Sequence, residues 1–292
     1  MTFVVLGASG QTGSVVAEEL LAAGHKVRCV VRRSEQADAW KARGAEAAVA
    51  DLADAKALVR AFKGGAGLYL INPPAYHAED IFAAAATVHT NAIQAAERAG
   101  VQHVVALSSV GAQCRRGTGN ILTTRNLEDQ LAESKLRTTI IRAANFMENF
   151  GWALDEAAAD GVLHSMLVPV SKPIPMVSVR DIGSVAAQSL ISGAVAPSLI
   201  ELHGPSQYSP DDAAFLLSDL LSRPVRARAI PEDLWPDRLG AAGMSLSATK
   251  AFVEMYRGFN DGTVEFSGSG IAVRGSVTLD DALTALVADR TR

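Results

Sequence analysis

The chain has 292 residues, of which 49% are hydrophobic and 20% are charged, and its formal net charge is −4. This length and apolar content exclude a disordered chain and predict one large domain, or a large and a small domain. The small net charge, with both signs interspersed, argues against direct nucleic-acid binding and against binding to a membrane surface.

The first predicted elements are a strand at residues 3–6, a glycine turn and a helix at residues 14–23. Gly7, Gly10 and Gly13 have the spacing GxxGxxG. Such glycines permit a tight turn, let the backbone approach a ligand and let helix and strand pack closely. Free N–H groups at the helix start favour an anion, so the unit predicts a site for a dinucleotide pyrophosphate. A glycine-rich turn without a ligand is the alternative. The other turn residues assigned to this site are Ser9, Gln11 and Thr12.

Strand-like and helix-like segments then alternate along the chain. Further strands are predicted at residues 27–31, 47–50, 67–71, 104–107 and 138–142. Helices are predicted between them at residues 34–43, 53–62, 79–99 and 123–134. Short apolar strands separated by helices are typical of a parallel sheet covered on both faces. The fold class predicted is therefore α/β, with a doubly wound parallel (Rossmann) sheet in the order 3-2-1-4-5-6.

Prolines interrupt shorter elements after about residue 147. We expect residues 1–150 to form the dinucleotide-binding domain. Residues 151–292 are expected to form mostly a smaller C-terminal lobe for substrate or partner, above the carboxyl edge of the sheet. Segments near residues 174–190 and 199–202 are expected to return to the sheet, with strands at Val177–Val179 and Leu199–Leu202. Asp181 is expected to cap a helix at residues 182–191.

The end of the second strand predicts which dinucleotide binds. A site for NAD usually has an acidic residue here, which binds the ribose 2′-hydroxyl. This chain has Arg32 and Arg33 instead, and Arg32 follows Gly13 by nineteen residues. Guanidinium groups suit a 2′-phosphate, so the sequence favours NADP(H) over NAD(H), unless both arginines are only solvated surface residues. Asp51 and Leu52, after the third strand, are candidates to flank the adenine, and Asp51 is also a candidate helix cap.

Three more strand ends supply candidate residues at the same edge of the sheet. Asn72, Pro73 and Pro74 follow the fourth strand, where the prolines fix the chain beside ribose or nicotinamide or simply form a turn. Ser108 and Ser109 end the fifth strand, either to bond ribose or substrate or only to end the strand. After the sixth strand, Asn145 and Phe146 are best placed to face the pocket.

Together these motifs resemble those of the NmrA-like family, a group of atypical short-chain dehydrogenases/reductases. The resemblance rests on GASGQTG, the basic end of the second strand, LSSVGA, RAANFMEN and the run Val179–Gly183, and it covers residues 1 to about 190. It implies an NADP-binding Rossmann fold with a small C-terminal lobe. It also implies one of two uses, because some relatives reduce quinones or similar acceptors and others are non-catalytic sensors of nicotinamide redox state.

The chain departs from the catalytic pattern of the extended short-chain enzymes. Those enzymes carry Tyr-x-x-x-Lys on the helix after the fifth strand, with a Glu four residues after the Lys. Glu128 matches that Glu, which places Thr124 at the Lys position and Asn120 at the Tyr position. Neither residue can protonate an alkoxide near neutral pH, so ordinary ketone reduction is disfavoured. The catalytic residues are therefore unknown from sequence.

A conjugated acceptor, such as a quinone or an azo compound, spreads the incoming charge and needs little help from an acid. The first hypothesis is thus an NADP(H)-dependent oxidoreductase acting on such a small molecule. The second is an NADP(H)-binding redox sensor that acts through a protein partner. The aromatic and apolar residues proposed for an acceptor pocket, or for simple packing between lobes, are Tyr76, Met147, Phe150 and Trp152.

The remaining residues predict no further chemistry. Six histidines are scattered without ligand spacing, so no metal site is expected, and His89 is expected on a helix face. Cys29 and Cys114 fit packing residues of a reduced protein. No apolar stretch reaches the roughly 18 residues of a membrane span, and no charged leader precedes the first strand, so the expected location is the cytoplasm. The sequence predicts no oligomeric state.

Overall fold

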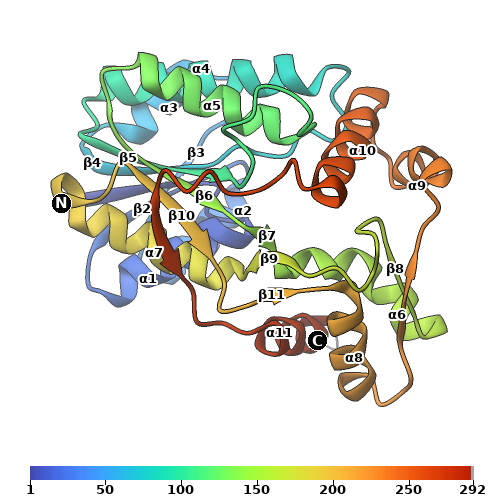
Figure 1. Ribbon diagram of the computed structural model, residues 1–292. Coiled ribbons are helices and arrows are strands. Elements are labelled where there is room, and N and C mark those ends of the chain that lie inside the picture. The colour runs from blue at the N-terminus through green and yellow to red at the C-terminus, as the bar shows by residue number, and fades with distance from the viewer. Residues whose placement is uncertain (291–292) are drawn as a thin grey trace.

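A parallel sheet is the centre of the computed structural model, which describes residues 1–290 (Figure 1). Within these residues the sheet has eight strands in the order β3-β2-β1-β4-β5-β6-β10-β13, and every neighbouring pair is parallel. The predicted order 3-2-1-4-5-6 and the predicted α/β class are confirmed, and two later strands extend the sheet. The strands are β1 (Thr2–Leu6), β2 (Lys26–Val31), β3 (Glu46–Val49), β4 (Gly65–Leu70), β5 (His103–Ser109), β6 (Arg137–Ala143), β10 (Leu199–His203) and β13 (Ile271–Arg274).

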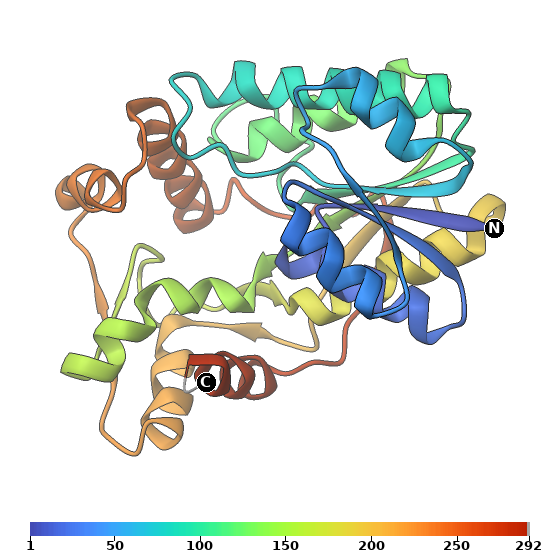
Figure 2. The same ribbon diagram turned by 180° about the vertical axis from the view of Figure 1, so that it is seen from behind.

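Helices cover both faces of the sheet because alternate strand residues point to opposite faces. Val4 and Leu6 of β1 pack with one set of helices, and Phe3 and Val5 pack with the other. The first set is α3 (Ala55–Phe62), α4 (Ile81–Ala99) and α5 (Ile121–Glu133), and the second is α1 (Gln11–Ala22), α2 (Ser34–Ala42) and α7 (Val179–Ser192). Seen from behind, the two helical layers lie on opposite sides of the sheet (Figure 2).

The second half of the chain adds shorter elements beside the carboxyl edge of the sheet. They surround an apolar core of their own, which includes Met147, Leu163, Leu217 and Leu283. The short helix η2 (Gly193–Val195) lies apart from them, between α7 and β10. The elements beside the carboxyl edge are β7 (Asn145–Phe146), η1 (Met147–Ala153), α6 (Leu154–Asp160), β8 (Val162–Ser165), β9 (Ile174–Val177), β11 (Gln207–Tyr208), α8 (Pro210–Leu220), β12 (Arg226–Ala229), η3 (Glu232–Leu234), α9 (Trp235–Ala241), α10 (Leu246–Asp261) and α11 (Leu279–Arg290). Since β10 and β13 lie in the main sheet, these elements do not form one continuous stretch of chain. The division near residue 150 stays a prediction.

The prediction for residues 177–191 was wrong in two details. The strand ends at Val177 and belongs to a small three-stranded sheet with β7 and β11, rather than to the main sheet. The helix begins at Val179, because the Ser178 hydroxyl accepts the backbone N–H of Arg180 and caps the helix there. Asp181 therefore lies inside the helix and does not cap it. Its carboxylate accepts hydrogen bonds from the backbone N–H groups of Ser276 and Val277, which fastens the chain after β13.

Helix α10 returns across the sheet edge and packs near the starts of α4 and α5 (Figure 1). The amide of Asn120 donates to the carbonyl of Ala251 at 3.1 Å. A Cβ atom at Gly119 would lie 1.9 Å from the same carbonyl oxygen, so only glycine allows this approach. These contacts hold α10 against the residues that precede α5.

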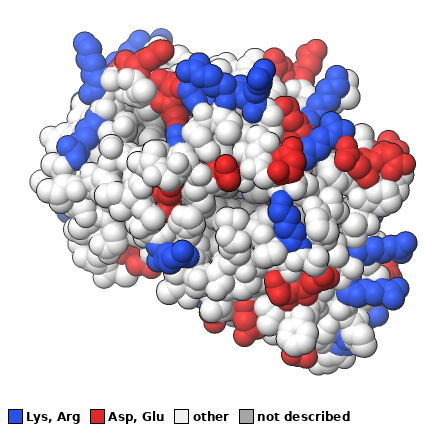
Figure 3. Space-filling view, in the orientation of Figure 1, with Lys and Arg blue, Asp and Glu red and all other residues white. Residues whose placement is uncertain are grey.

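Charged residues of both signs are interspersed on the face shown in Figure 3. This distribution agrees with the small net charge of the chain. Among residues 1–290, no helix is both long enough and apolar enough to cross a membrane.

Candidate functional site

The glycine turn between β1 and α1 leaves the start of the helix open. Gly7 has a φ of +70°, and its carbonyl accepts the amide N–H of Gly10 at 2.8 Å. A Cβ atom at Gly13 would lie 2.3 Å from that carbonyl oxygen, so Gly13 permits the close contact of helix and turn. No side chain caps the helix at Gly10. The first amide N–H groups of α1 are therefore free to bind an anion, as the sequence predicts.

A cleft of about 500 Å³ lies at this turn and along the carboxyl ends of β4 and β5. It brings together the starts of α1 and α5, the loop after β4, and part of η1 and α10. Its lining includes Gly10, Gln11, Thr12, Asn72, Pro73, Pro74, Tyr76, Ser108, Ser109, Asn120, Thr124, Phe146 and Trp152, all of them singled out from the sequence. We call this the cofactor cleft.

A second cavity of about 430 Å³ adjoins the cofactor cleft and lies among the C-terminal elements. The two hollows share four lining residues: Tyr76, Asn149, Trp152 and Phe252. The ring of Tyr76 makes edge contacts with Trp152 and Phe252, with centroid distances of 6.1 and 5.6 Å. These three rings form an aromatic neck between the cleft and the second cavity, which we call the distal chamber.

Three predicted pocket residues lie elsewhere than in the cofactor cleft. Asn145 and Phe150 line the distal chamber instead. Met147 lines neither hollow, because its side chain is fully buried in the core of the C-terminal elements. Its position after Phe146 suggested a pocket residue, but η1 begins at Met147 and turns it inward.

Arg32 and Arg33 lie at the carboxyl end of β2, beside the glycine turn, and both are exposed. Among the residues described, neither guanidinium forms an ion pair, whereas Arg28 on the same strand is paired with Glu46. Asp51 is also exposed and accepts the amide N–H of Ala53 at 2.8 Å. It does not cap the next helix, because Asp54 takes that place. Leu52 is half-buried against the apolar core of this face, and Ser9 lies exposed in the turn.

A buried ion pair lies directly behind the cleft. Arg142 of β6 donates to Glu128 of α5 through Nε at 2.9 Å and through Nη2 at 2.6 Å, and the two side chains are 10% and 12% exposed. The hydroxyl of Ser108 also donates to Glu128, at 2.5 Å. The Ser108 side chain is thus engaged with Glu128. The pair fixes α5, which carries Thr124 and begins directly after Asn120, to the ends of β5 and β6.

His89 is fully buried and not on an open helix face. Its Nε2 lies 3.0 Å from the amide oxygen of Asn72, and its Nδ1 lies 3.0 Å from that of Asn126. Asn72 in turn donates to the hydroxyl of Thr123 at 2.7 Å. The imidazole therefore holds the loop after β4 against α5. Sequence reasoning missed this role because Asn72 and Asn126 lie far from His89 along the chain.

We expect stability to fall on acidification because of two buried histidines. Burial lowers the pKa of His89 below its ordinary value of 6.5, and burial together with Arg137 lowers that of His103. Unfolding then takes up protons, so these histidines cost no stability above pH 6.5 and cost increasingly more as the pH falls below it. Each contributes a slope of up to about 1.4 kcal/mol per pH unit.

Urea unfolding at about pH 7.5 and about pH 5.5 measures this loss. The His89→Gln variant should lose less stability between the two values than the unmodified chain. The same substitution at the exposed His77 provides the matched control for the chemical change. An unchanged difference in His89→Gln would contradict the assignment.

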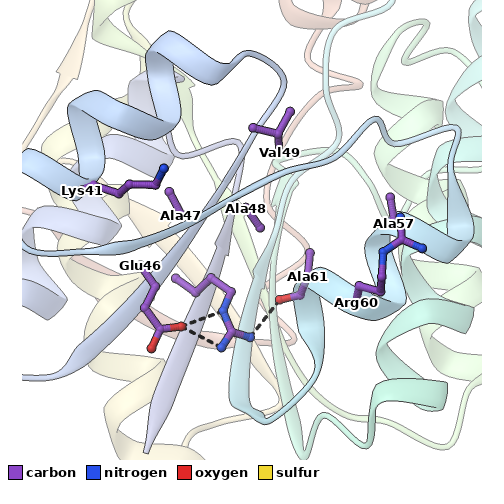
Figure 4. Close-up of a pocket in the computed structure, with 9 residues that line it drawn as sticks. Lys41, Glu46, Ala47, Ala48, Val49, Ala57, Arg60 and Ala61 are labelled. Carbon is purple, nitrogen blue, oxygen red and sulfur yellow. Dashed lines mark hydrogen bonds and ion pairs between the residues drawn. The ribbon is translucent and has the colours of Figure 1, made fainter.

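Another hollow, of about 520 Å³, lies along the whole of β3, beside Arg28 of β2 and part of α3. Figure 4 shows Glu46 and Ala61 on its two sides. Arg28 spans it and donates to Glu46 at 2.9 Å and to the carbonyl of Lys63 at 2.7 Å. Arg28 and Glu46 are thus paired with each other within the protein, and no residue of the glycine turn lines this hollow. The cofactor cleft is therefore the better candidate site.

No group of three or more His, Cys, Asp or Glu side chains is placed to hold a metal ion in residues 1–290. Both cysteines are free thiols. Burial raises the pKa of Cys29 to about 12, which keeps this thiol protonated.

A doubly wound sheet with an open helix start at its carboxyl edge defines the class of Rossmann-type dinucleotide-binding folds. Within that class the chain belongs to the NmrA-like family, whose model matches residues 1–282. The resemblance drawn from the motifs is confirmed, and it extends well beyond residue 190.

Three similar proteins illustrate the comparison. The chain is 28% identical over 260 residues to an NAD(P)H azoreductase of Xenophilus azovorans, covering 87% of this chain and 85% of that protein. A solved NADPH-dependent quinone oxidoreductase of Escherichia coli has a TM-score of 0.78 and 23% identity, with 100% of both chains covered. A triphenylmethane reductase of Citrobacter sp., solved with NADP(H), has a TM-score of 0.79 and 20% identity, covering 98% of this chain and 100% of that one. At these identities the two structures establish the fold alone.

Proposed function

We propose that the protein is an NADP(H)-dependent oxidoreductase that reduces a conjugated acceptor, of the quinone or azo type, without a Tyr/Lys catalytic pair. The observation that carries this proposal is the pair of adjoining hollows, the cofactor cleft at the open helix start and the distal chamber, which share the three rings of the aromatic neck in their walls. The two hollows provide one place for a dinucleotide and an adjoining place for an acceptor.

The residues of the cleft fit a phosphorylated dinucleotide. The uncapped start of α1 would hold the pyrophosphate, and the unpaired guanidiniums of Arg32 and Arg33 would hold the 2′-phosphate. Pro73 and Pro74 would form a fixed wall beside the nicotinamide end. When bound, the reduced nicotinamide supplies a hydride to the acceptor.

The acceptor side of the cleft supplies apolar contacts and no strong acid. Asn120 and Thr124, at the positions expected for the Tyr and Lys of the extended short-chain enzymes, line the cleft, and Thr124 donates its hydroxyl proton to the carbonyl of Ile121 at 2.8 Å. Burial raises the pKa of Tyr76, so this phenol stays protonated at neutral pH. The protein's contribution is thus to hold two flat ring systems together and to exclude water. The names of the azoreductase relative and of the two solved reductases refer to acceptors of this conjugated kind.

The test is oxidation of NADPH with a panel of quinones and azo compounds. We expect turnover in the unmodified protein and none in a Gly10→Trp variant, whose side chain would occupy the cleft beside the glycine turn. Turnover no greater than in this variant would contradict the proposal.

Binding distinguishes the alternative function. A protein that binds NADPH but oxidises it with no acceptor would support a redox sensor, particularly if its affinities for NADPH and NADP+ differ. Calorimetry with both cofactor forms measures that difference.

A further inference from the structure

The distal chamber has a group of charged and polar side chains in an otherwise largely apolar wall. Glu156 of α6, His164 of β8 and Arg238 of α9 line the distal chamber, and none of them lines the cofactor cleft. Many of the other lining side chains are apolar, among them Met166, Leu167, Leu239, Met244 and Met255. The chamber therefore offers apolar contacts for a ring and, in the same wall, charged and polar groups.

The three polar residues form one hydrogen-bonded cluster. His164 Nδ1 lies 2.7 Å from Glu156 Oε2, and a guanidinium nitrogen of Arg238 donates to the same oxygen. Burial alone would raise the pKa of Glu156, but the bonds from His164 and Arg238 lower it, so the carboxylate stays ionised at neutral pH. The charges of Glu156 and Arg238 cancel each other.

One edge of the cluster is left open. In residues 1–290, Glu156 Oε1 and His164 Nε2 have no hydrogen-bond partner. The side chains of Glu156 and His164 are 39% and 26% exposed, so a group entering the chamber can reach them. A carboxylate oxygen accepts from a hydroxyl or amino group, and a cluster without net charge does not favour an ionic group.

We propose that the distal chamber binds the second ring of an acceptor with two linked aromatic rings, and that the Glu156–His164–Arg238 cluster hydrogen-bonds a neutral hydroxyl or amino group on that ring. This inference rests on the proposed function, since the first ring must lie in the cofactor cleft. It narrows the acceptor to molecules long enough to pass the neck formed by Tyr76, Trp152 and Phe252.

The test compares 4-hydroxyazobenzene with 4-methylazobenzene, which have the same length and differ in the distal polar group. We expect the hydroxyl compound to have a kcat/KM about 10- to 100-fold higher, the size of a hydrogen bond to a charged group. In a Glu156→Gln variant this preference should shrink toward unity. Equal kcat/KM values for the two compounds in the unmodified protein would overturn the inference, as would an unchanged preference in the variant.

A second variant tests the chamber without touching the cluster. Ala242 is exposed and lines only the distal chamber, so Ala242→Trp fills the chamber with little risk to folding. We expect kcat/KM for 4-hydroxyazobenzene to fall about tenfold relative to that for 1,4-benzoquinone, which has a single ring. Ala285→Trp, on the exposed side of α11, is the matched control and should leave the ratio unchanged. A ratio unaffected by Ala242→Trp would overturn the inference.

Calorimetry separates this inference from the proposed function. The NADP+-loaded protein should bind 4-hydroxyazobenzene more tightly than 4-methylazobenzene, and Glu156→Gln should remove the difference. If neither azobenzene nor benzoquinone is reduced, the proposed function fails. If benzoquinone is reduced but the azobenzenes bind alike, or a distal sulfonate binds better than the hydroxyl, only the chamber assignment fails.

Discussion

A Glu128→Gln variant is expected to lose about 3–5 kcal/mol of its free energy of unfolding, the usual result of breaking a buried ion pair. Arg142 would keep its charge but lose the two-pronged carboxylate that it contacts at 2.9 and 2.6 Å. Ser108 would lose its charged acceptor as well. Urea unfolding at neutral pH measures the change, which should appear as a lower midpoint with an unchanged slope.

The same helix provides a matched control. Asp129 is 55% exposed and pairs with Arg125 one turn away on α5. The Asp129→Asn substitution makes the same chemical change at the surface and should cost no more than about 1 kcal/mol. If the two variants lose equal stability, Arg142 and Glu128 do not stabilise the fold as a buried ion pair.

The second large effect concerns the choice of dinucleotide. We expect Arg32→Glu to weaken NADPH binding about 10- to 100-fold, because it removes a charge-assisted bond to the 2′-phosphate and adds a repulsive carboxylate. NADH carries no such phosphate, so its affinity should stay the same or improve. Titration of both cofactors by calorimetry gives the two changes directly.

Arg60→Glu is the control for a general effect of charge. Arg60 is exposed on α3 and lines the hollow of Figure 4, away from the cofactor cleft. Its reversal should leave both affinities close to their original values. If NADPH affinity is the same in Arg32→Glu and in the unmodified protein, Arg32 does not bind the 2′-phosphate.

The sequence predicted the first six strands and the glycine turn because local patterns determine them. Buried parallel strands are short apolar runs, and only glycine fits a turn with the contacts of Gly7 and Gly13. Strand β13 escaped prediction because it lies at an edge, where Ile271, Ala272 and Arg274 are exposed and the alternation of apolar residues is lost. Its place is determined by pairing with β10, which the sequence pattern does not show.

The sequence predicted those parts of the candidate site that depend on local sequence patterns. The residues at strand ends meet in the cofactor cleft because the carboxyl ends of parallel strands share one edge. The distal chamber instead depends on contacts between distant segments, such as Glu156 with Arg238, that no local spacing reveals. Met147 was predicted to line the pocket because it follows Phe146, but its side chain is buried in the core of the C-terminal elements.

Direct hydride transfer within the cofactor cleft is tested most directly by a single-turnover isotope experiment. NADPH carrying deuterium at C4 of the nicotinamide, on one face or the other, is mixed with excess protein and a quinone or azo acceptor, and its oxidation is followed in time. The account predicts slower oxidation when deuterium is on one face and an unchanged rate when it is on the other, because the bound ring presents a single face to the acceptor. Equal rates for both labelled forms and for unlabelled NADPH, or no oxidation at all, would contradict it.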